Sequence, residues 1–282
     1  MNNQDLYEKI KKKKSFLCVG LDIDLDKIPD FLRNNNDPIF SFGKSIIDAT
    51  AKYCIAYKPN IAFYETYGID GWRALEKTID YIKSKHPDIF TIADAKRCDI
   101  ENTSERYAKA YFDRLNFDAI TVSPYMGKDS VEPFLNYKNK HTILLALTSN
   151  PGAKDFQFNQ YNGKKLYQQV IESSMKWKNS EQLIYVVGAN HTSLISNIRK
   201  IVPDNFLLIP GVGAQGGNLK EISLSGMNNK CGIIVNASRS IIYSSSGKDY
   251  ENTASISAKR IKEEMENSVS YTHLTLPTTV IV

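Results

Sequence analysis

The chain has 282 residues, of which 42% are hydrophobic and 24% charged, so it can bury a large core in one sizeable domain or two small ones. Its formal net charge of +5 comes with no basic-aromatic platform and no zinc-finger spacing, which argues against a nucleic acid as its partner. No apolar run approaches the ~18 residues of a membrane span and nothing resembles a signal peptide, so no membrane partner is expected.

Lysines and cysteines give the first local signals. The run KKKK at residues 11–14 directly precedes an apolar segment, and we interpret it as the solvated start of an element. The histidines show no metal-ligand spacing, so no metal site is expected. The cysteines favour reduced thiols in a cytoplasmic protein over a disulfide framework. They lie far apart, three of them in or beside apolar runs, at Cys18, Cys54, Cys98 and Cys231.

Short β-rich runs recur along the chain, and most are almost continuously apolar, which is typical of parallel strands covered on both faces. They occupy residues 15–22, 54–60, 89–96, 118–124, 142–149, 183–190, 206–213 and 232–239. Amphipathic segments of helical period lie between them, for example residues 69–85, 104–115 and 253–266. In the first of these segments one buried helix face is predicted by the spacing of Trp72, Leu75, Ile79 and Ile82.

Strand and helix alternate eight times, which predicts an α/β fold, a single-domain (β/α)8 TIM barrel. A doubly wound open sheet is the alternative, but no GxGxxG unit follows the first strand, where a dinucleotide-binding fold carries it. No Pro/Ser-rich linker divides the chain, so we expect one domain over residues 1–267. Residues 268–282 lack acidic residues, Lys and Arg, and we interpret them as a non-native or disordered tail, with a native extra strand as the alternative.

Polar residues collect at the carboxyl ends of the predicted strands, which is where the active sites of barrels form. A single polar strand end would carry little weight, whereas a whole series of them indicates a site. The series is Asp22, Lys58, Asp94, Lys96, Ser123, Ser149, Asn190 and Arg239.

The densest charged cluster lies in TIADAKRCDI at residues 91–100. Asp94 and Lys96 are expected on one face of their strand, because alternate residues share a face. Asp99 follows three residues later and can reach toward a neighbouring subunit, while Lys58 supplies a second inward cation. A lysine held between carboxylates stays protonated and can deliver a proton to a carbanion. A purely structural ion-pair network at the barrel mouth is the alternative interpretation.

Two further segments predict a phosphate site. PGVGAQGG at residues 210–217 is a glycine-rich loop after the seventh strand, and NASRS at residues 236–240 ends the eighth. The loops after these two strands frequently bind phosphate in barrels. Arg239 can donate bidentate hydrogen bonds to phosphate oxygens, and Gln215 can donate a neutral one. Glycines that serve only tight turns are the alternative for the loop.

Taken in order, these segments resemble the orotidine 5′-phosphate decarboxylase family over residues 15–265. DAKRCDIENT at residues 94–103 is similar to the family's Asp-x-Lys-x-x-Asp signature followed by Ile and Thr. The chain is most similar to the bacterial branch with a longer insertion after the first strand, here residues 23–40. Cys98 and Glu101 depart from related sequences, which often carry glycine at these places. The other matching segments are CVGLD, YKPN, TVSPYMG, LTSNPGA, PGVGAQGG and NASRS.

The resemblance implies a reaction without metal or cofactor, in which orotidine 5′-monophosphate loses CO2 and gives UMP, the last step of de novo pyrimidine synthesis. It implies that Lys96 protonates C6 of the pyrimidine and that Asp94 lies near the departing carboxylate. Lys58 and Asp99 would complete the charged tetrad. Asp99 would come from the partner subunit of a homodimer, so that each site needs both subunits.

The resemblance also implies which residues bind the substrate, and that residues 213–218 form a mobile lid. The ribose would be bound by Asp22, Lys58 and the partner's Thr103. The base would be contacted by Ile100 and Ser149. The phosphate would be bound by Gln215, Arg239 and the backbone around Ser238.

Three other functions stay open. A Mg-dependent sugar-phosphate lyase of the same superfamily, of the keto-gulonate phosphate decarboxylase or hexulose phosphate synthase type, needs acidic metal ligands. Lys58 and the lack of an extra acid beside it argue against that metal. A phosphoribosyl isomerase offers no role for the charged cluster. A non-catalytic nucleotide-binding module is argued against by the intact Asp94, Lys96 and Asp99.

Overall fold

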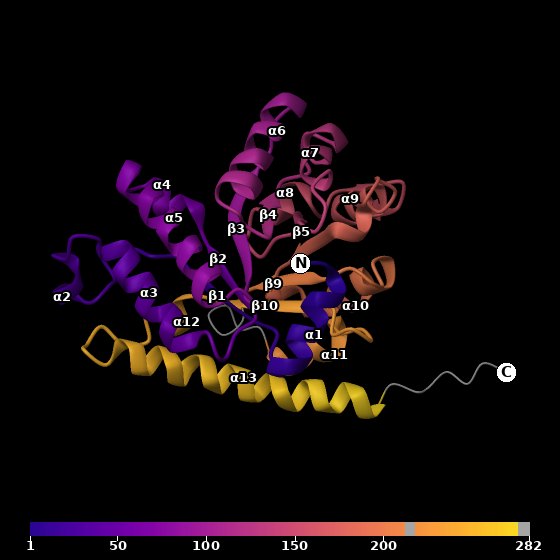
Figure 1. The fold of residues 1–282 in the computed structure, drawn as a ribbon. Helices are drawn as coiled ribbons and strands as arrows, with labels where there is room; N and C mark the ends of the chain where they lie inside the picture. The colour runs from indigo at the N-terminus through magenta and orange to yellow at the C-terminus, as the bar shows by residue number, and fades with distance from the viewer. Residues whose placement is uncertain (212–217, 276–282) are drawn as a thin grey trace.

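Eight parallel strands close into a barrel (Figure 1) in the computed structural model of the chain, which describes residues 1–211 and 218–275, apart from the side chains of residues 268–275. Their bounds are β1 Leu17–Leu21, β2 Ala56–Pro59, β3 Phe90–Arg97, β4 Ala119–Val122, β5 His141–Leu147, β8 Leu183–Val187, β9 Leu207–Pro210 and β10 Ile233–Ala237. Around the barrel they follow the order β1, β10, β9, β8, β5, β4, β3, β2. Because β1 pairs with both β10 and β2, the sheet has no edge, and the doubly wound alternative is wrong.

All eight predicted strands are confirmed, and their burial explains why each appears in the sequence as a nearly continuous apolar run. Every residue of β1, β2, β4, β8 and β10 is buried. Strands covered on both faces have no solvent-facing side, so their sequences are apolar without alternation.

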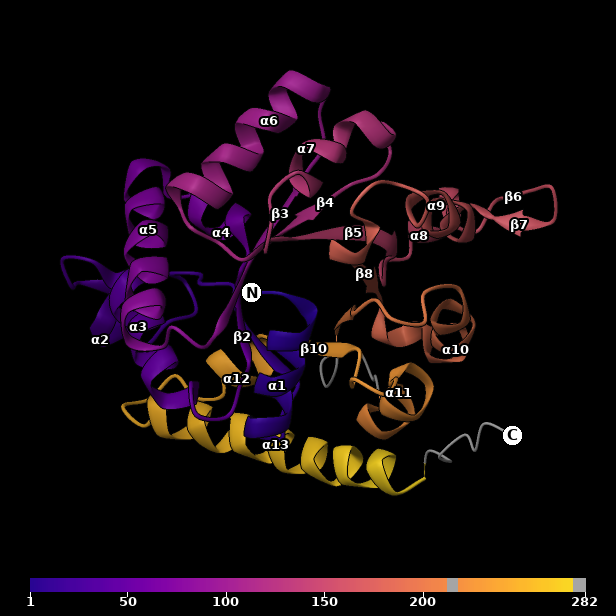
Figure 2. The same ribbon diagram turned by 45° about the vertical axis from the view of Figure 1, so that its right-hand side comes forward.

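Helices surround the strands on the outside of the barrel (Figure 2). Within the described residues, no helix combines the length and the apolar character needed to cross a bilayer. The longer helices are α1 Asn3–Lys13, α3 Pro38–Thr50, α5 Gly68–Lys85, α6 Glu101–Lys109, α9 Leu166–Ser174, α10 Thr192–Ile201, α11 Leu219–Gly226 and α13 Tyr250–Thr275. Shorter ones are α2 Asp30–Arg33, α4 Ile61–Glu65, α7 Glu132–Leu135, α8 Ala153–Phe156 and α12 Arg239–Ile242, and a π-helical turn, Ala110–Arg114, extends α6.

The predicted face of α5 is confirmed except at Trp72. Leu75, Ile79 and Ile82 are buried, whereas Trp72 is 38% exposed. Gly71 takes the inward position instead, because a Cβ there would lie 1.8 Å from the carbonyl oxygen of Tyr64 on α4. The close approach of α4 and α5 at this glycine therefore sets the rotation of α5 and turns Trp72 toward solvent.

The lysine run at residues 11–14 ends an element and does not begin one, so that prediction is wrong. It forms the last turn of α1, where positive charge is favourable because the carbonyl end of a helix carries partial negative charge. Lys13 Nζ donates to the carbonyl oxygens of Ala51 and Cys54, both at 3.0 Å. The run thus ties α1 to the segment that leads into β2.

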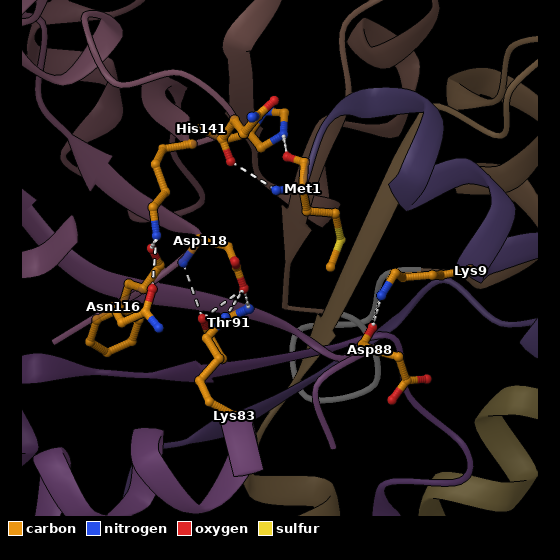
Figure 3. A network of polar contacts seen from close by, with 11 residues as sticks. Met1, Lys9, Lys83, Asp88, Thr91, Asn116, Asp118 and His141 are labelled. Atoms are coloured by element: carbon orange, nitrogen blue, oxygen red, sulfur yellow. Dashed lines mark hydrogen bonds and ion pairs between the residues drawn. The ribbon is translucent and has the colours of Figure 1, made fainter. Parts of the chain in front are cut away.

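Helix α1 lies across the end of the barrel at which the strands begin, and polar contacts hold it there (Figure 3). The Met1 ammonium donates to the carbonyl oxygen of Asn139 at 2.9 Å, and His141 Nε2 lies 3.0 Å from the Met1 carbonyl oxygen. Lys9 Nζ donates to the carbonyl oxygen of Asp88 at 2.7 Å. The amino ends of β3 and β5 are therefore covered by the first helix of the chain.

Asp118 forms the centre of the buried polar network beneath the barrel (Figure 3). Its Oδ2 accepts hydrogen bonds from Lys83 Nζ at 2.5 Å, from the Thr91 N–H at 2.8 Å and from the Thr91 hydroxyl at 2.9 Å. Burial alone would raise the pKa of Asp118, but the Lys83 charge and these hydrogen bonds outweigh it and lower that pKa below its ordinary value.

Two features lie outside the repeating pattern. The antiparallel strands β6 (Gln160–Tyr161) and β7 (Lys164–Lys165) form a hairpin that projects from the barrel (Figure 2). Its turn residues Asn162 and Gly163 both have positive φ, the conformation that an Asn-Gly hairpin requires.

Helix α13, which packs against α3, α11 and α12, continues past residue 267 to Thr275. The rest of the predicted tail lies outside the described residues.

Candidate active site

Three of the predicted site residues are in direct contact at the carboxyl ends of β2 and β3. Lys58 Nζ lies 2.7 Å from Asp94 Oδ2, and Lys96 Nζ lies 2.5 Å from Asp94 Oδ1. The side chains of Lys58 and Asp94 are 5% and 12% exposed, whereas that of Lys96 is 52% exposed. One largely buried carboxylate thus holds one buried and one accessible ammonium group.

The pairing of Asp94 with Lys96 depends on an irregularity in β3. Ala93 pairs with Ile120 of β4, but the next paired residue on β3 is Arg97, opposite Val122, so β3 bulges between them. Lys96 lies within the bulge with φ of +47°, in the left-handed region that residues other than glycine disfavour. The two-residue alternation of a regular strand, which predicted the pairing, is therefore not what produces it.

The charges in this cluster fix one another's ionisation. Burial alone would raise the pKa of Asp94, but Lys58 and Lys96 outweigh it and hold that pKa well below its ordinary value. Burial alone would lower the pKa of Lys58, but Asp94 and Asp22 outweigh it and raise that pKa above its ordinary value. Asp94 and Lys58 are therefore both charged at neutral pH.

Asp22 follows β1 and supplies a second carboxylate close enough to act on the Lys58 charge. Its Oδ1 is buried and has no hydrogen-bond partner among the described residues. The hydroxyl of Tyr243 donates to its backbone carbonyl oxygen at 2.7 Å and so fixes the chain at this point. A buried acceptor without a partner is costly, which makes this oxygen a candidate for binding a ligand hydroxyl.

Asp99, Ile100 and Thr103 lie beyond the end of β3, at the start of α6. Asp99 Oδ1 accepts a hydrogen bond from the Ile100 N–H at 2.7 Å, and the Ile100 side chain is 59% exposed. Within the described part of the chain, no hydrogen bond or ion pair joins Asp99 to Asp94 or Lys96. The fourth charge of the predicted tetrad thus stands apart from the other three in the single chain.

Cys98 and Glu101, the two departures from the family pattern, flank these residues. Cys98 is a free, half-buried thiol between the bulge and Asp99, and Glu101 is the exposed first residue of α6. Glu101 therefore lies in the first turn of a helix, where negative charge is favourable.

The predicted phosphate residues lie at the carboxyl end of β10. Ser238 precedes α12, and Arg239 is exposed as the first residue of that helix. Gly20 on β1 makes room for Ser238, because a Cβ at residue 20 would lie 1.7 Å from the Ser238 hydroxyl oxygen. Ser149 is half-buried after β5, and Asn190 Nδ2 donates to its carbonyl oxygen at 3.0 Å. Gln215 and most of the 213–218 loop lie outside the described residues.

Two polar residues of the site were not assigned from the sequence. Thr121 on β4 is 2% exposed; its hydroxyl contacts both Asp94 Oδ1, at 3.2 Å, and the Lys96 N–H, at 2.8 Å. Asn236 on β10 is 6% exposed, and its Oδ1 is buried without a partner among the described residues. Each is a polar residue inside an otherwise apolar strand, and such a residue needs a hydrogen-bond partner. That requirement is the signal that could have found them.

The sequence matches known proteins over nearly its whole length. Residues 15–251 match the family described as "Orotidine 5'-phosphate decarboxylase / HUMPS family". The orotidine 5′-phosphate decarboxylase of Christiangramia forsetii is 59% identical over 269 residues, which cover 95% of this chain and 99% of that protein. The one of Flavobacterium johnsoniae is 60% identical over 265 residues, which cover 94% of this chain and 97% of that protein.

Solved structures that resemble this fold carry names of the same kind as the relatives found by sequence. The OMP decarboxylase of Leishmania donovani has a TM-score of 0.81 at 34% identity and covers 95% of this chain and 99% of its own. The UMP synthase of the same organism has a TM-score of 0.83 at 35% identity and covers 95% of this chain and 56% of its own. By its sequence, its closed barrel and the ordered strand-end motifs, the chain belongs to the orotidine 5′-phosphate decarboxylase / HUMPS family.

Proposed function

We infer that this chain decarboxylates orotidine 5′-monophosphate to UMP and CO2, the last step of de novo pyrimidine synthesis. The observation that carries the inference is the Asp94 carboxylate held between Lys58 and Lys96 at the strand ends of a barrel from this family. Curated relatives at 59% and 60% identity carry the name of this activity.

In the proposed reaction, the bond between C6 of the pyrimidine and its carboxylate breaks, CO2 leaves, and the electron pair stays on C6. The Lys96 ammonium then gives a proton to that carbon. Lys96 suits this role because it is half-exposed, yet its position is fixed by the hydrogen bond to Asp94. Asp94 stays ionised beside the departing carboxylate, and such preorganised charges need no rearrangement during the reaction.

This chemistry needs no metal and no cofactor, because Lys96 supplies the proton and the substrate keeps the electron pair. Each oxygen of Asp94 accepts a hydrogen bond from an ammonium group, and these two positive charges would repel a metal cation at the same carboxylate. That arrangement disfavours the Mg-dependent sugar-phosphate lyase, in which acidic side chains would have to hold the metal.

We propose that the residues around the cluster bind the rest of the substrate. The unpartnered oxygen of Asp22 fits a ribose hydroxyl, and Lys58 lies beside it. Exposed Arg239 fits the phosphate, because its guanidinium can donate two parallel hydrogen bonds to phosphate oxygens. The backbone at Ser238 and the side chain of Gln215 would complete the phosphate site, and Ser149 would contact the pyrimidine ring.

We propose further that the working unit is a homodimer in which Asp99 and Thr103 enter the partner's site and Ile100 packs near its base. Apolar side chains gather at the carboxyl ends of β3 and β4, with Ile100 59%, Tyr125 84% and Met126 45% exposed. Exposed apolar side chains of this kind mark interaction surfaces. Asp99, which no hydrogen bond or ion pair joins to Asp94 or Lys96 within the described residues of its own chain, would complete the tetrad across the interface.

Two other expectations belong to the proposal. We place the protein in the cytoplasm, because its four cysteines are free, three of them buried, as expected in a reducing compartment. We also propose that residues 1–267 form the decarboxylase domain and that residues 268–282 are not needed for activity. The family match ends before those last residues, at residue 251.

The test is a spectrophotometric decarboxylation assay with orotidine 5′-monophosphate, run with and without EDTA. The wild-type chain should turn the substrate over equally in both, and Lys96→Ala should abolish turnover while the protein keeps its fold. Lys259→Ala is the matched control, because Lys259 is 57% exposed and pairs with Glu263 on the outer helix α13. Activity lost in EDTA would overturn the metal-free mechanism, and an active Lys96→Ala variant would overturn the role of Lys96.

A further inference from the structure

Thr121 joins the two halves of the charged motif from a neighbouring strand. Its hydroxyl oxygen accepts a hydrogen bond from the Lys96 N–H, with 2.8 Å between nitrogen and oxygen. The same hydroxyl donates to Asp94 Oδ1 at 3.2 Å. Neither direction is ambiguous, because a backbone N–H can only donate and an ionised carboxylate can only accept. The Thr121 hydroxyl therefore uses its only hydrogen to bind Asp94 and one of its lone pairs to bind the Lys96 N–H.

The bulge in β3 explains why the side chain of Thr121 is needed. Between Ala93 and Arg97 the backbone pairing of β3 with β4 is interrupted, and Lys96 takes a left-handed conformation there. The Lys96 N–H finds the Thr121 hydroxyl in place of a strand carbonyl. A backbone conformation that L-residues disfavour persists only when the surroundings hold it, and this hydrogen bond is such a restraint.

Thr121 also fixes the carboxylate that orients the Lys96 ammonium. Asp94 Oδ1 receives both the Thr121 hydroxyl and Lys96 Nζ, while Oδ2 receives Lys58 Nζ. One hydroxyl thus restrains the backbone of Lys96 directly and its side chain through Asp94.

We propose that Thr121 is a positioning residue of the decarboxylation, which holds the Lys96 bulge and the Asp94 carboxylate in the geometry that protonates the substrate. The proposal rests on the proposed function. It assigns Thr121 no contact with the substrate, so its loss should lower kcat far more than it changes KM. In the proposed function, ribose and phosphate are bound by other residues, among them Asp22 after β1, Lys58 on β2 and Arg239 after β10.

The experiment compares three substitutions at one site with a matched change on the next strand. Thr121→Val keeps the shape of the side chain and removes the hydroxyl, whereas Thr121→Ser keeps the hydroxyl. Thr142→Val is the control, because Thr142 is fully buried on β5 and its hydroxyl has no partner among the described residues. Thr121→Ala forms a pair with Thr121→Ser that differs by a single hydroxyl, for use if Thr121→Val does not fold.

Thr121→Val should lower kcat about tenfold to a hundredfold, as expected when a buried N–H and a carboxylate lose a shared partner, with KM changed much less. The kcat of Thr121→Ser should stay within about threefold of the wild-type value, and the kcat of Thr142→Val should equal the wild-type value. A folded Thr121→Val variant with wild-type kcat would overturn the proposal, as would a Thr121→Ser variant as slow as Thr121→Val or Thr121→Ala. A wild-type chain without decarboxylase activity would instead overturn the proposed function.

Discussion

Lys58 and Asp94 form an ion pair almost withdrawn from solvent, with Nζ 2.7 Å from Oδ2 and side chains only 5% and 12% exposed. Removing one partner of such a pair leaves the other charge buried, unpaired and poorly solvated. Here the cost is increased, because Lys96 contacts the same carboxylate and would be left as a like charge beside Lys58. The pair is therefore expected to serve both the stability of the barrel and its chemistry.

Asp94→Asn should lower the free energy of unfolding by about 3–5 kcal/mol and abolish turnover. Urea denaturation followed by circular dichroism measures the first effect, and the decarboxylation assay measures the second. Asp70→Asn is the control, because Asp70 is 86% exposed in its pair with Arg73 and should cost no more than about 1 kcal/mol. Equal losses of stability in the two variants would contradict the importance of the buried pair.

Arg239→Ala should raise KM about tenfold to a hundredfold, because charge-assisted hydrogen bonds to the phosphate are lost, while kcat falls less. Arg239→Lys should recover only part of the affinity, since an ammonium cannot form the bidentate pair. Steady-state kinetics distinguishes the two parameters. Arg114→Ala controls for the loss of an exposed arginine, 75% exposed in its pair with Glu76. A KM equal to that of the wild type would remove Arg239 from the phosphate site.

Mixing two inactive variants tests whether Asp99 acts across a dimer. In a mixed dimer of Lys96→Ala and Asp99→Ala subunits, one site would carry both lesions and the other neither. Unfolding and refolding an equimolar mixture should then restore about a quarter of the wild-type activity, because half of the dimers are mixed and each holds one intact site. Each variant refolded alone is the control. No recovery at all would mean that Asp99 serves its own chain.

The stability of the barrel should decrease as the pH falls from about 7.5 to 5.5, at up to about 1.4 kcal/mol per pH unit for a single proton. Burial lowers the pKa of His141 below its ordinary 6.5, so the unfolded chain binds a proton there before the folded chain does. The contribution of this histidine to stability is therefore complete about one pH unit above 6.5 and is lost as the pH drops through 6.5 and below. Urea denaturation at several pH values measures the slope.

His141→Gln should flatten this part of the pH profile. The His141 ring nitrogens face the carbonyl oxygens of Met1 and Gln182, at 3.0 and 3.2 Å, and an amide can donate to carbonyls without titrating. His86→Gln controls for the loss of an imidazole outside this network. An unchanged slope in His141→Gln would assign the pH dependence to other groups.

Much of the fold was predictable because its signals are local. Strands buried on both faces are apolar throughout, so each of the eight could be located without its neighbours. The charged rim was predictable because parallel strands place their carboxyl ends together. Lys58 and Asp94 were therefore expected to meet, although 36 positions separate them in the chain.

What the sequence did not reveal depends on contacts between distant segments. The bulge at Lys96 arises from the pairing of β3 with β4, and the hydroxyl that holds it lies 25 positions away on Thr121. Trp72 faces solvent because Gly71 lets α4 approach α5, a contact that helical periodicity alone does not encode. The β6–β7 hairpin differs from these, because its Asn162–Gly163 turn is a local signal that could have predicted it.

The polar network beneath the barrel and the charged cluster of the site lie at opposite ends of the strands. Met1, Asp118 and His141 make their contacts where the strands begin, whereas Asp94 and Lys96 make theirs where β3 ends. Effects on stability usually add when the substituted sites share no partners, so changes beneath the barrel should shift stability independently of changes at the strand ends. The underside is thus where evolutionary drift, or deliberate engineering, can adapt this enzyme to a new growth temperature without retuning its catalysis.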